Sequence, residues 1–309
     1  MCIFAGVFNA CSINMKILTV VVSYNFMPWL DLCLGSLERS IYKTDVIVID
    51  NASSDFTVAI IAERYPNVKI VANDANLGFG KANNIGIQYA MQHGYDAVLL
   101  LNQDAWIAED TLGQLVEVSQ RHPEYGIVSP MHLTAKGNKP EKGFAQYTGI
   151  HELDQCPSDE IVEVPFINAA IWFVRLDVLS CIGLFDPIFY HYGEDIDLTH
   201  RLNYYHYKTG YVPSAIGYHD RESREVTKER FFRGELVYHL AEYTNVNYPF
   251  VKAFGMSIVA EIKKSFISLI HGHVNDMWAY TKQAFSLLLK TPAVALARQR
   301  SSHVNLDNY

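Results

Sequence analysis

Residues 17 to 101 alternate short apolar runs with segments of helical periodicity, and no other feature of the chain constrains the fold as strongly. The apolar runs predict four strands, at Ile17 to Val22, Val46 to Ile49, Val68 to Ala72 and Ala97 to Leu101. A run without polar interruptions is typical of a strand that is buried on both faces of a parallel sheet. The repeated order of strand and helix therefore predicts an α/β fold with a doubly wound, mainly parallel sheet, like that of Rossmann folds.

The segments between these strands carry helix signals. Pro28 is placed to open a first helix, Asp55 to cap a second, and Gly94 to end a third that begins near Lys81. Further along the chain the pattern predicts helices at Glu109 to Arg121 and Glu194 to Tyr205, a strand at Ile127 to Ser129 and apolar structure at Val164 to Val174. Helices are therefore expected to connect the strands and cover the sheet.

The chain divides into three parts. Residues 1–14 lack the basic start of a signal peptide and precede a good strand, so we interpret them as an extra segment that results from a start codon placed too early. Residues 15–226 form the α/β domain, in which 134–160 are expected to be a long surface loop near the site. Residues 227–309 are predicted to be a mostly helical C-terminal appendage.

Composition disfavours several classes of protein. The chain has 309 residues, half of them hydrophobic, and a formal net charge of −8, which argues against nucleic acid as a partner because phosphate contacts need a basic surface. Its five cysteines are an odd number without C-x-x-C spacing, so we expect neither disulfides nor a zinc site, and a reducing compartment. No stretch of about 20 residues is apolar enough to span a bilayer, because Glu261, Lys263 and Lys264 interrupt the best candidate.

Polar clusters follow all four predicted strands. They are Ser23-Tyr24-Asn25, Asp50 to Asp55, Asn73 to Asn84 and Asn102-Gln103-Asp104. Ligands of a parallel sheet bind beyond the carboxyl ends of its strands, so the four clusters are expected at one edge of the sheet. Asp104 is then expected where a metal ion or a phosphate would bind.

Some of these residues have a structural interpretation beside a functional one. Asp50 can accept hydrogen bonds from a nucleobase or a ribose, whereas Asp55 is expected to cap the helix that follows. Gly78 and Gly80 form the first half of a dinucleotide-binding fingerprint, but Asn83 occupies the third glycine position. The two glycines either let the backbone approach a diphosphate or let the helix pack tightly, and the sequence leaves both interpretations open.

A second acidic cluster opens the last predicted helix of the α/β domain. Helical spacing places Glu194, Asp197 and Arg201 along one side and turns Asp195 away from them. Acids in a first helical turn also interact favourably with the helix dipole, so the cluster has a purely structural alternative. His219, which closes a short strand-like run, is by itself more typical of a packing residue.

Taken together, these motifs resemble those of the inverting family 2 glycosyltransferases, particularly the branch that includes rhamnosyltransferases. The matching stretches are VVVSYN (20–25), VIVIDNASSD (46–55), NLGFGKANNIGI (76–87), LLLNQDAWI (99–107), INAAIWFVRLDVLSCIGLFD (167–186), YGEDIDLTHRL (192–202) and YVPSAIGYH (211–219). Each is weakly specific, but the ordered set is highly specific and covers the chain from residue 17 to about 220. The resemblance implies a GT-A fold that binds a nucleotide-sugar at the carboxyl edge of the sheet.

The resemblance also assigns residues to the nucleotide-sugar. They are Ser23, Tyr24, Asp50, Asn76, Gly78, Asn102, Asp104 and Arg201. Tyr24 and Asp50 are implied to hold the base and the ribose, and Asn76 and Gly78 to line the diphosphate.

A divalent cation, Mg²⁺ or Mn²⁺, is implied on the diphosphate, with Asp104 and His219 as its protein ligands. Many relatives carry Asp-x-Asp where this chain has Asn102-Gln103-Asp104, so one carboxylate of the pair is missing. Metal binding is then either weakened or left to Asp104 with His219, although the amide oxygen of Asn102 can still coordinate or accept a hydrogen bond from a ribose hydroxyl.

The same resemblance implies a single displacement with inversion. Asp195 removes a proton from an acceptor hydroxyl, and Glu194 positions Asp195 or contacts the acceptor. Arg201 either assists on the diphosphate or pairs with Asp197 to hold the helix. The expected donor is dTDP-rhamnose or a UDP-sugar, and the expected acceptor is a glycan or lipid-linked glycan. Cell-surface polysaccharide synthesis in the cytoplasm, at the inner face of the plasma membrane, is the implied setting.

Two other functions are a catalytically inactive scaffold that binds a nucleotide-sugar, and a nucleotidyltransferase. The intact pair Glu194-Asp195 argues against the first, and the absence of a basic residue from Ser23 to Pro28 argues against the second.

The C-terminal appendage has a basic and apolar stretch between residues 277 and 300. It contains Lys282, Lys290, Arg298 and Arg300 and no acidic residue, beside apolar Phe285, Leu288 and Leu289. This composition predicts either a peripheral contact with an anionic membrane or a packing helix or homodimer contact.

Overall fold

The computed structural model describes residues 14–221 and 227–309, so the expectation for residues 1–14 falls almost entirely outside the described residues. Contacts divide the chain into two compact units. Among the described residues, unit 1 consists of residues 14–77, 82–181 and 208–221, and unit 2 of residues 78–81, 182–207 and 227–309. By these contacts, the segment around Glu194 groups with the C-terminal helices.

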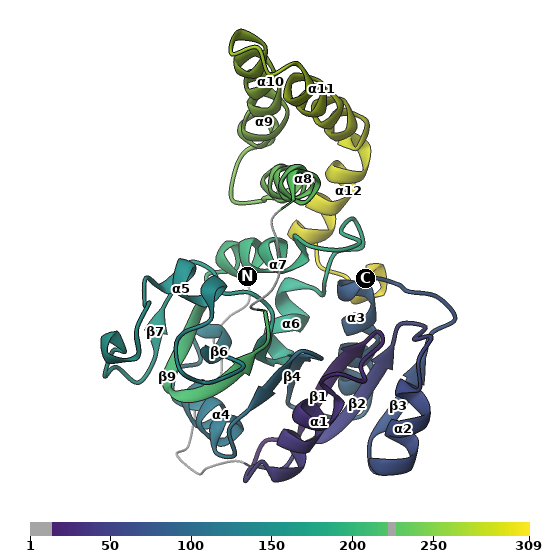
Figure 1. Ribbon diagram of the computed structural model, residues 1–309, viewed down its shortest axis with the longest axis vertical. Helices are drawn as coiled ribbons and strands as arrows, with labels where there is room; N and C mark the ends of the chain where they lie inside the picture. Colours follow the sequence, from purple (N-terminus) through teal and green to yellow (C-terminus); the bar gives the residue numbers. More distant parts are fainter. Residues whose placement is uncertain (1–13, 222–226) are drawn as a thin grey trace. The chain divides into compact units, whose positions relative to one another are not determined.

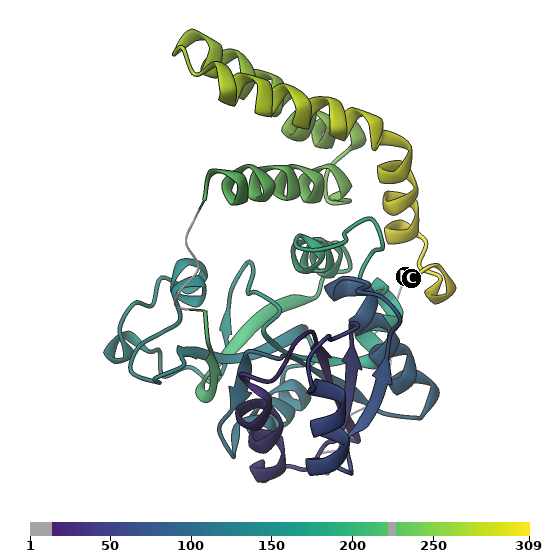
Figure 2. The same ribbon diagram turned by 45° about the vertical axis from the view of Figure 1, so that its right-hand side comes forward.

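Unit 1 is built on a single sheet (Figures 1 and 2). Its strands are β1 (Ile17–Ser23), β2 (Asp45–Asp50), β3 (Lys69–Ala72), β4 (Ala97–Asn102), β5 (Ala105–Ile107), β6 (Tyr125–Thr134), β7 (Val162–Glu163), β8 (Ile171–Arg175) and β9 (Lys208–His219). Its helices are α1 (Leu30–Arg39), α2 (Thr57–Arg64), α4 (Thr111–Arg121), α5 (Lys142–Thr148), the short 3₁₀ helix η1 (Leu153–Gln155), and most of α3 (Phe79–Gln92) and α6 (Leu176–Ile182).

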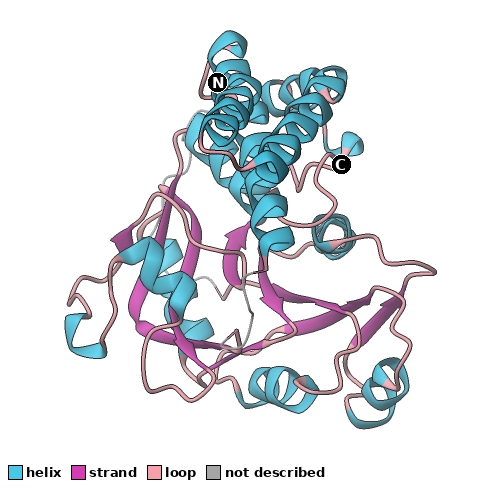
Figure 3. Ribbon diagram, turned by 45° about the horizontal axis from the view of Figure 1, so that its top comes forward, coloured by secondary structure: helices cyan, strands magenta, loops and turns pink. Residues whose placement is uncertain are grey.

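The strand order is β3-β2-β1-β4-β8-β6-β9-β5, with β7 paired to β9. Figure 3 draws the strands in magenta and the helices in cyan. Strands β1 to β4 are parallel, as the sequence predicts, and each of these four is found within one residue of its expected ends. The strand expected at Ile127 to Ser129 is longer than predicted, since β6 runs from Tyr125 to Thr134. Strands β8 and β5 run antiparallel to β4 and β9, respectively. The parallel register places Ser23 opposite Asp50 and Val22 opposite Asn102, so the polar clusters after β1, β2 and β4 do meet at one edge.

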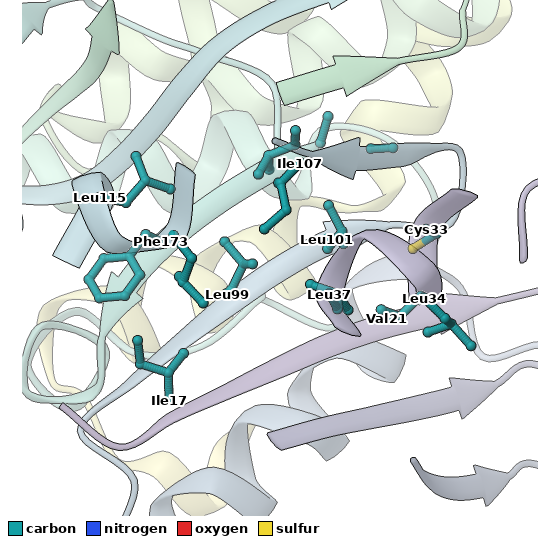
Figure 4. Packing of buried hydrophobic residues seen from close by; sticks show 14 of the residues in the cluster. Ile17, Val21, Cys33, Leu34, Leu37, Leu99, Leu101, Ile107, Leu115 and Phe173 are labelled. Atoms are coloured by element: carbon teal, nitrogen blue, oxygen red, sulfur yellow. The ribbon is translucent and has the colours of Figure 1, made fainter. Parts of the chain in front are cut away.

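The main core of unit 1 lies between the sheet and the helices α1 and α4 (Figure 4). Leu34 and Leu37 of α1 pack with Val21 and Leu99 of the sheet and Leu115 of α4. All five side chains are at most 4% exposed. A strand with apolar side chains on both faces needs helices on both faces as well.

Helix α3 covers the opposite face of the sheet. Successive side chains of a strand point to opposite faces, so Val20 points away from the core that contains Val21. A Cβ atom at Gly86 of α3 would come within 2.4 Å of a Val20 methyl carbon, so only a glycine permits this approach. The sequence predicts Asp55 as the cap of α2, whereas the N-cap residue is Phe56; Asp55 precedes it and accepts a hydrogen bond from Thr57 N, in the first turn of the helix, at 3.0 Å.

The segment 134–160, expected to be a surface loop, contains more structure than its composition indicates. Glu141 caps α5 by accepting a hydrogen bond from Phe144 N at 2.9 Å, and Gly149 ends the helix in a left-handed conformation. The Phe144 side chain is fully buried against Tyr211. One anchored aromatic residue is enough to hold a short helix that periodicity alone does not reveal.

Unit 2 is helical in its described part, as predicted for the C-terminal residues. Its elements are α7 (Glu194–Tyr204), α8 (Lys228–Thr244), α9 (Phe250–Phe254), the π-helix η2 (Gly255–Val259), α10 (Ala260–Ile270), α11 (Val274–Leu289), α12 (Thr291–Ser302) and the 3₁₀ helix η3 (Leu306–Asn308). Its core includes Phe189, Tyr243, Ile258, Leu287 and Val294.

Within residues 14–221 and 227–309, no helix combines the length and apolar character needed to cross a membrane. Cys33, Cys156 and Cys181 are free thiols, and Cys2 and Cys11 lie outside the described residues. Burial raises the pKa of the Cys33 thiol far above its ordinary value, so this cysteine is inert packing.

Candidate active site

Asp50 organises the carboxyl edge of the sheet between β1 and β2. Its carboxylate is 2% exposed and accepts hydrogen bonds from Ser23 Oγ at 2.7 Å, Ser53 N at 2.9 Å and Ser53 Oγ at 2.5 Å. Asp50 therefore has a structural role, since it shapes the loop that follows β2. A carboxylate has about four acceptor positions, so capacity for a ligand hydroxyl remains.

The loops around Asp50 contain strained backbone. Asn25 and Ala52 have φ values of 53° and 62°, which non-glycine residues seldom adopt. Asn51, 3% exposed, holds the next loop as well, because its side-chain oxygen accepts hydrogen bonds from Asn73 Nδ2 at 3.0 Å and Leu77 N at 3.4 Å. Strain held by surrounding hydrogen bonds is concentrated at functional sites, which marks this edge as a candidate binding surface.

Gln103 links the polar cluster after β4 to the one after β1 by hydrogen bonds. Tyr24 N donates to Gln103 Oε1 at 2.8 Å, and Gln103 Nε2 donates to Tyr24 O at 3.2 Å. These two hydrogen bonds use only the backbone of Tyr24, and 48% of the residue is exposed. An exposed ring on a fixed backbone is suited to stacking on a nucleobase.

Asn102 presents an unused acceptor at the end of β4. Its backbone N donates to Ala170 O at 2.8 Å, while its side-chain Oδ1 is buried and has no hydrogen-bond partner among the described residues. A buried polar atom without a partner is costly, and a bound ligand commonly satisfies it. This observation supports a role for Asn102 toward a hydroxyl group or a cation.

Asp104 and His219, 115 residues apart in sequence, are brought together by the pairing of β5 with β9. Ala105 lies opposite His219 in the antiparallel register, and Asp220 N donates to Asp104 O at 2.9 Å. His219 Nε2 is 3.4 Å from Asp104 Oδ1, and the two residues are 1% and 7% exposed. In the part of the chain that the structure describes, no third His, Cys, Asp or Glu completes a metal cluster with them.

A second histidine, His132, lies close to His219. The His132 ring centroid is 6.3 Å from that of His219, and His132 Nε2 is 2.9 Å from Ser129 Oγ. Burial, and then the charge of His219, lowers the pKa of His132 to about 3. His132 is therefore neutral at physiological pH and adds no positive charge beside Asp104 and His219.

In unit 2, helix α7 is fixed by a buried ion pair. Arg201 and Asp197 are 1% and 2% exposed, with Arg201 Nε 3.0 Å from Asp197 Oδ2. The other guanidinium nitrogens of Arg201 donate to Ile182 O at 2.7 Å and Leu184 O at 2.6 Å, and Thr244 Oγ1 donates to Asp197 Oδ1 at 3.0 Å. The predicted pairing with Asp197 is observed, and the geometry favours this structural role of Arg201 over contact with a diphosphate.

Glu194 and Asp195 begin the same helix in different environments. Glu194 is 4% exposed, and its Oε2 has no hydrogen-bond partner among the described residues. Burial raises the pKa of Glu194 to about 8, with a further increase from the charge of Asp195. Asp195 is half-buried, and its Oδ1 accepts a hydrogen bond from Ile196 N at 2.9 Å. At neutral pH Glu194 is therefore protonated, which leaves Asp195 as the more accessible carboxylate of the two.

Within unit 2, Gly78 and Gly80 permit close packing of the chain. Gly78 has a φ of +82°, and a Cβ atom there would come within 2.0 Å of Tyr190 O. A Cβ atom at Gly80 would be 2.9 Å from that of Phe185. These contacts support the tight-packing interpretation of both glycines. Asn76 is exposed in the loop after β3, in unit 1.

The structure thus distributes the predicted residues over both units. Unit 1 contains Ser23, Tyr24, Asp50, Asn76, Asn102, Asp104 and His219, and unit 2 contains Gly78, Glu194, Asp195 and Arg201. Sequence reasoning missed Ser53, Gln103 and His132. Ser53, three residues after Asp50, has the spacing of a local side-chain turn and could have been found, whereas Gln103 and His132 carry no sequence signal.

Protonation of Glu194 predicts a pH dependence of stability. The folded chain holds this proton up to a pH of about 8, whereas the unfolded chain releases it near the ordinary value of 4.5. The contribution is therefore complete below pH 4.5 and is lost as the pH rises to about 8, by at most about 1.4 kcal/mol per pH unit. In urea unfolding, the free energy of unfolding of wild type is expected to fall by about 2 kcal/mol more than that of Glu194→Gln when the pH is raised from slightly acidic to slightly alkaline.

The matched control is Glu229→Gln, since the Glu229 side chain is 84% exposed. Its profile should follow that of wild type. Parallel profiles for wild type and Glu194→Gln would show that Glu194 is ionised in the folded protein at neutral pH.

Comparison with known proteins identifies the class. Residues 19–173, half of the chain, match the family described as glycosyl transferase family 2, and the chain therefore belongs to this family of glycosyltransferases. It is 26% identical over 230 residues to the N-acetylglucosaminyl-diphospho-decaprenol L-rhamnosyltransferase of Mycobacterium tuberculosis, covering 65% of this chain and 75% of the relative. It is 30% identical over 106 residues to the undecaprenyl-phosphate mannosyltransferase of Micrococcus luteus, covering 33% of this chain and 44% of the relative.

The fold is shared with solved structures. S. aureus TarS, residues 1–349, superposes with a TM-score of 0.56 at 17% identity, covering 96% of this chain and 89% of that one. GalNAc-T7 superposes with a TM-score of 0.54 at 14% identity, covering 76% of this chain and 52% of that one. The predicted GT-A fold class is confirmed.

Proposed function

We propose that the protein is an inverting enzyme that transfers a sugar from dTDP-rhamnose or a UDP-sugar to a hydroxyl of a glycan or lipid-linked glycan, in cell-surface polysaccharide synthesis. The names of its relatives support this choice, including a dTDP-rhamnosyl transferase, RfbF of Shigella flexneri, which is 30% identical over 104 residues and is covered over 34% of its length. The TarS structures were solved with UDP and with UDP-GlcNAc. They support a nucleotide-sugar as the donor.

The donor is assigned to the carboxyl edge of unit 1. The exposed ring of Tyr24 stacks on the base, and Asp50 accepts hydrogen bonds from the ribose with the acceptor capacity that Ser23 and Ser53 leave over. Asn102 offers its buried amide oxygen to the same ligand. The proposal gives each of these residues a contact that the ligand-free protein leaves incomplete.

The observation that carries the proposal is the pairing of Asp104 with His219. One carboxylate and one imidazole are a suitable donor set for Mg²⁺ or Mn²⁺, and a diphosphate supplies further oxygens. GalNAc-T7, which shares the fold, was solved with UDP, GalNAc and Mn²⁺. A bound cation would offset the negative charge of the departing nucleoside diphosphate. His132, neutral because it is buried, does not compete electrostatically with such a cation.

Proton transfer is assigned to unit 2. Asp195 accepts the proton of the acceptor hydroxyl while that oxygen attacks the anomeric carbon and the bond to the diphosphate breaks. Glu194, protonated at neutral pH, keeps a second negative charge away from Asp195 and can donate a hydrogen bond to the acceptor. Gly78 and Arg201 serve the packing of this unit.

Thermal shift with a panel of nucleotide-sugars, with and without Mn²⁺, tests the donor site. A ligand that binds only the folded protein raises its melting temperature, so the correct donor with Mn²⁺ is expected to raise it by several degrees. Asp104→Asn and His219→Gln should each abolish the part of the shift that requires Mn²⁺. Asp154→Asn, an exposed carboxylate of η1, is the control.

Persistence of the full Mn²⁺-dependent shift in both variants would refute the cation site. Donor binding without transfer to any acceptor would favour the inactive scaffold.

A further inference from the structure

Helix α10 exposes an apolar stripe to solvent. The stripe, with the residue that precedes the helix, consists of Val259, Ile262, Phe266, Leu269 and Ile270. Spacings of three and four residues place these side chains on one face of the helix. Phe266 is 61% exposed and Ile270 65%, values typical of charged surface residues.

Helix α11 repeats this arrangement. Its exposed apolar residues are Val274, Trp278, Phe285, Leu288 and Leu289. They again follow helical spacing, and Trp278 and Leu289 are 55% and 66% exposed. Single exposed apolar residues are ordinary, but ten on two neighbouring helices mark an interaction surface.

The two helices lie side by side within unit 2 (Figures 1 and 2). Ser265 Oγ donates to Met277 O at 3.0 Å and lies 2.8 Å from Thr281 Oγ1, so their contact is made by polar and small groups. The exposed side chains of the two stripes take no part in these hydrogen bonds. We call the two stripes the α10–α11 surface.

The sequence segment that contains this surface has a positive formal charge. Residues 251–300 contain seven Lys or Arg and two acidic residues, a net charge of +5 in a chain of net charge −8. Both acids are offset: Asp276 pairs with Lys228 at 2.5 Å, and Glu261 is fully buried, with its pKa raised to about 7 by that burial.

Lys263 and Lys282 supply the cations of the α10–α11 surface. Both are exposed, and neither takes part in an ion pair with any residue that the structure describes. Two basic residues of the stretch between residues 277 and 300 interact with groups outside the α10–α11 surface. Arg300 pairs with Asp186 at 2.8 Å, and Arg298 donates to Tyr248 O at 2.6 Å. Fewer basic side chains are therefore available to the α10–α11 surface than the sequence indicates, and one of them, Lys263, belongs to α10.

We infer that the α10–α11 surface binds an anionic lipid bilayer, with its apolar side chains among the acyl chains and Lys263 and Lys282 at the headgroups. Apolar stripes bordered by lysines are the pattern of interfacial helices. A second copy of the chain fits less well, since two such segments repel each other. The inference rests on the proposed function in that a lipid-linked acceptor is presented at such a bilayer.

Vesicle flotation of the full chain, without sugar substrates, tests this inference. Wild type is expected to float with vesicles of phosphatidylcholine and phosphatidylglycerol, and far less with phosphatidylcholine alone. Ile270→Ser combined with Leu289→Ser should weaken binding at least tenfold, because two exposed apolar side chains no longer reach the bilayer. Ile41→Ser, which removes a 71% exposed isoleucine in unit 1, is the matched control and should float like wild type.

A second variant keeps the test independent of folding. Lys263→Gln with Lys282→Gln changes only exposed side chains, and it should weaken binding to the anionic vesicles about tenfold or more. Tryptophan fluorescence of wild type, to which the exposed Trp278 contributes, should shift to shorter wavelength on anionic vesicles.

Unchanged flotation of both double variants, or no flotation of wild type, would overturn the inference. A wild-type dimer that the serine variant converts to a monomer would assign the surface to a second copy instead. Thermal shift with the donor, measured on the same preparations, reports on the proposed function separately.

Discussion

Asp195→Asn is expected to reduce sugar transfer about 10²–10⁴-fold while donor binding stays intact. General bases contribute rate accelerations of this size, and asparagine keeps the shape of the side chain without its basicity. Glu194 cannot take over the role at neutral pH, because burial and its neighbour keep it protonated. The measurement is kcat for transfer with the donor found by thermal shift, together with the donor-induced shift of the variant.

Two comparisons make this test specific. Asp154→Asn, an equally conservative change at an exposed site, should transfer at the wild-type rate. Glu194→Gln should retain much of the activity, because glutamine resembles the protonated acid in both shape and charge. Near-complete transfer by folded Asp195→Asn would remove Asp195 as the base.

Arg201→Met is expected to destabilise the protein by about 3–5 kcal/mol. Removing one partner of a buried ion pair leaves the other charge uncompensated. Burial already raises the pKa of Asp197, and Arg201 opposes that effect from 3.0 Å. The carbonyls of Ile182 and Leu184 would also lose their donors. Urea unfolding monitored by circular dichroism gives the change in free energy.

The chain offers a matched control in a second pair with the same i, i+4 spacing. Arg233 and Glu229 are 59% and 84% exposed, and Arg233→Met should cost less than about 1 kcal/mol because solvent screens the pair. A loss of similar size in both variants would show that the buried pair has no special role. A double change, Arg201→Met with Asp197→Leu, should recover part of the loss, since no unpaired charge remains.

The parallel half of the sheet was predictable because its strands are uninterrupted apolar runs whose period is unambiguous. The antiparallel additions were not, since the sequence marks β8 only as an apolar segment and gives no sign of its direction. Pairing of β5 with β9 brings Asp104 to His219 across 115 residues, and only the family resemblance anticipated it.

The polar network of the site was less predictable than the fold. Arg201 has the residue type of a phosphate ligand, but two of its acceptors are the backbone carbonyls of Ile182 and Leu184, which every residue possesses. Gln103 likewise bonds to the backbone of Tyr24. Residue types identify potential hydrogen-bond donors, and only the folded structure shows which backbone acceptors they bind.

The ring of Tyr309 is packed inside unit 2. Its hydroxyl occupies the place where a side chain at Gly183 would begin, and the Arg201 guanidinium lies 5.5 Å from the ring centroid. The Tyr309 ring thus lies next to the ion pair of Arg201 with Asp197, which fixes α7. Loss of this ring, as in Tyr309→Ala, is therefore expected to loosen the packing around the helix that carries Glu194 and Asp195, although Tyr309 is far from both in sequence.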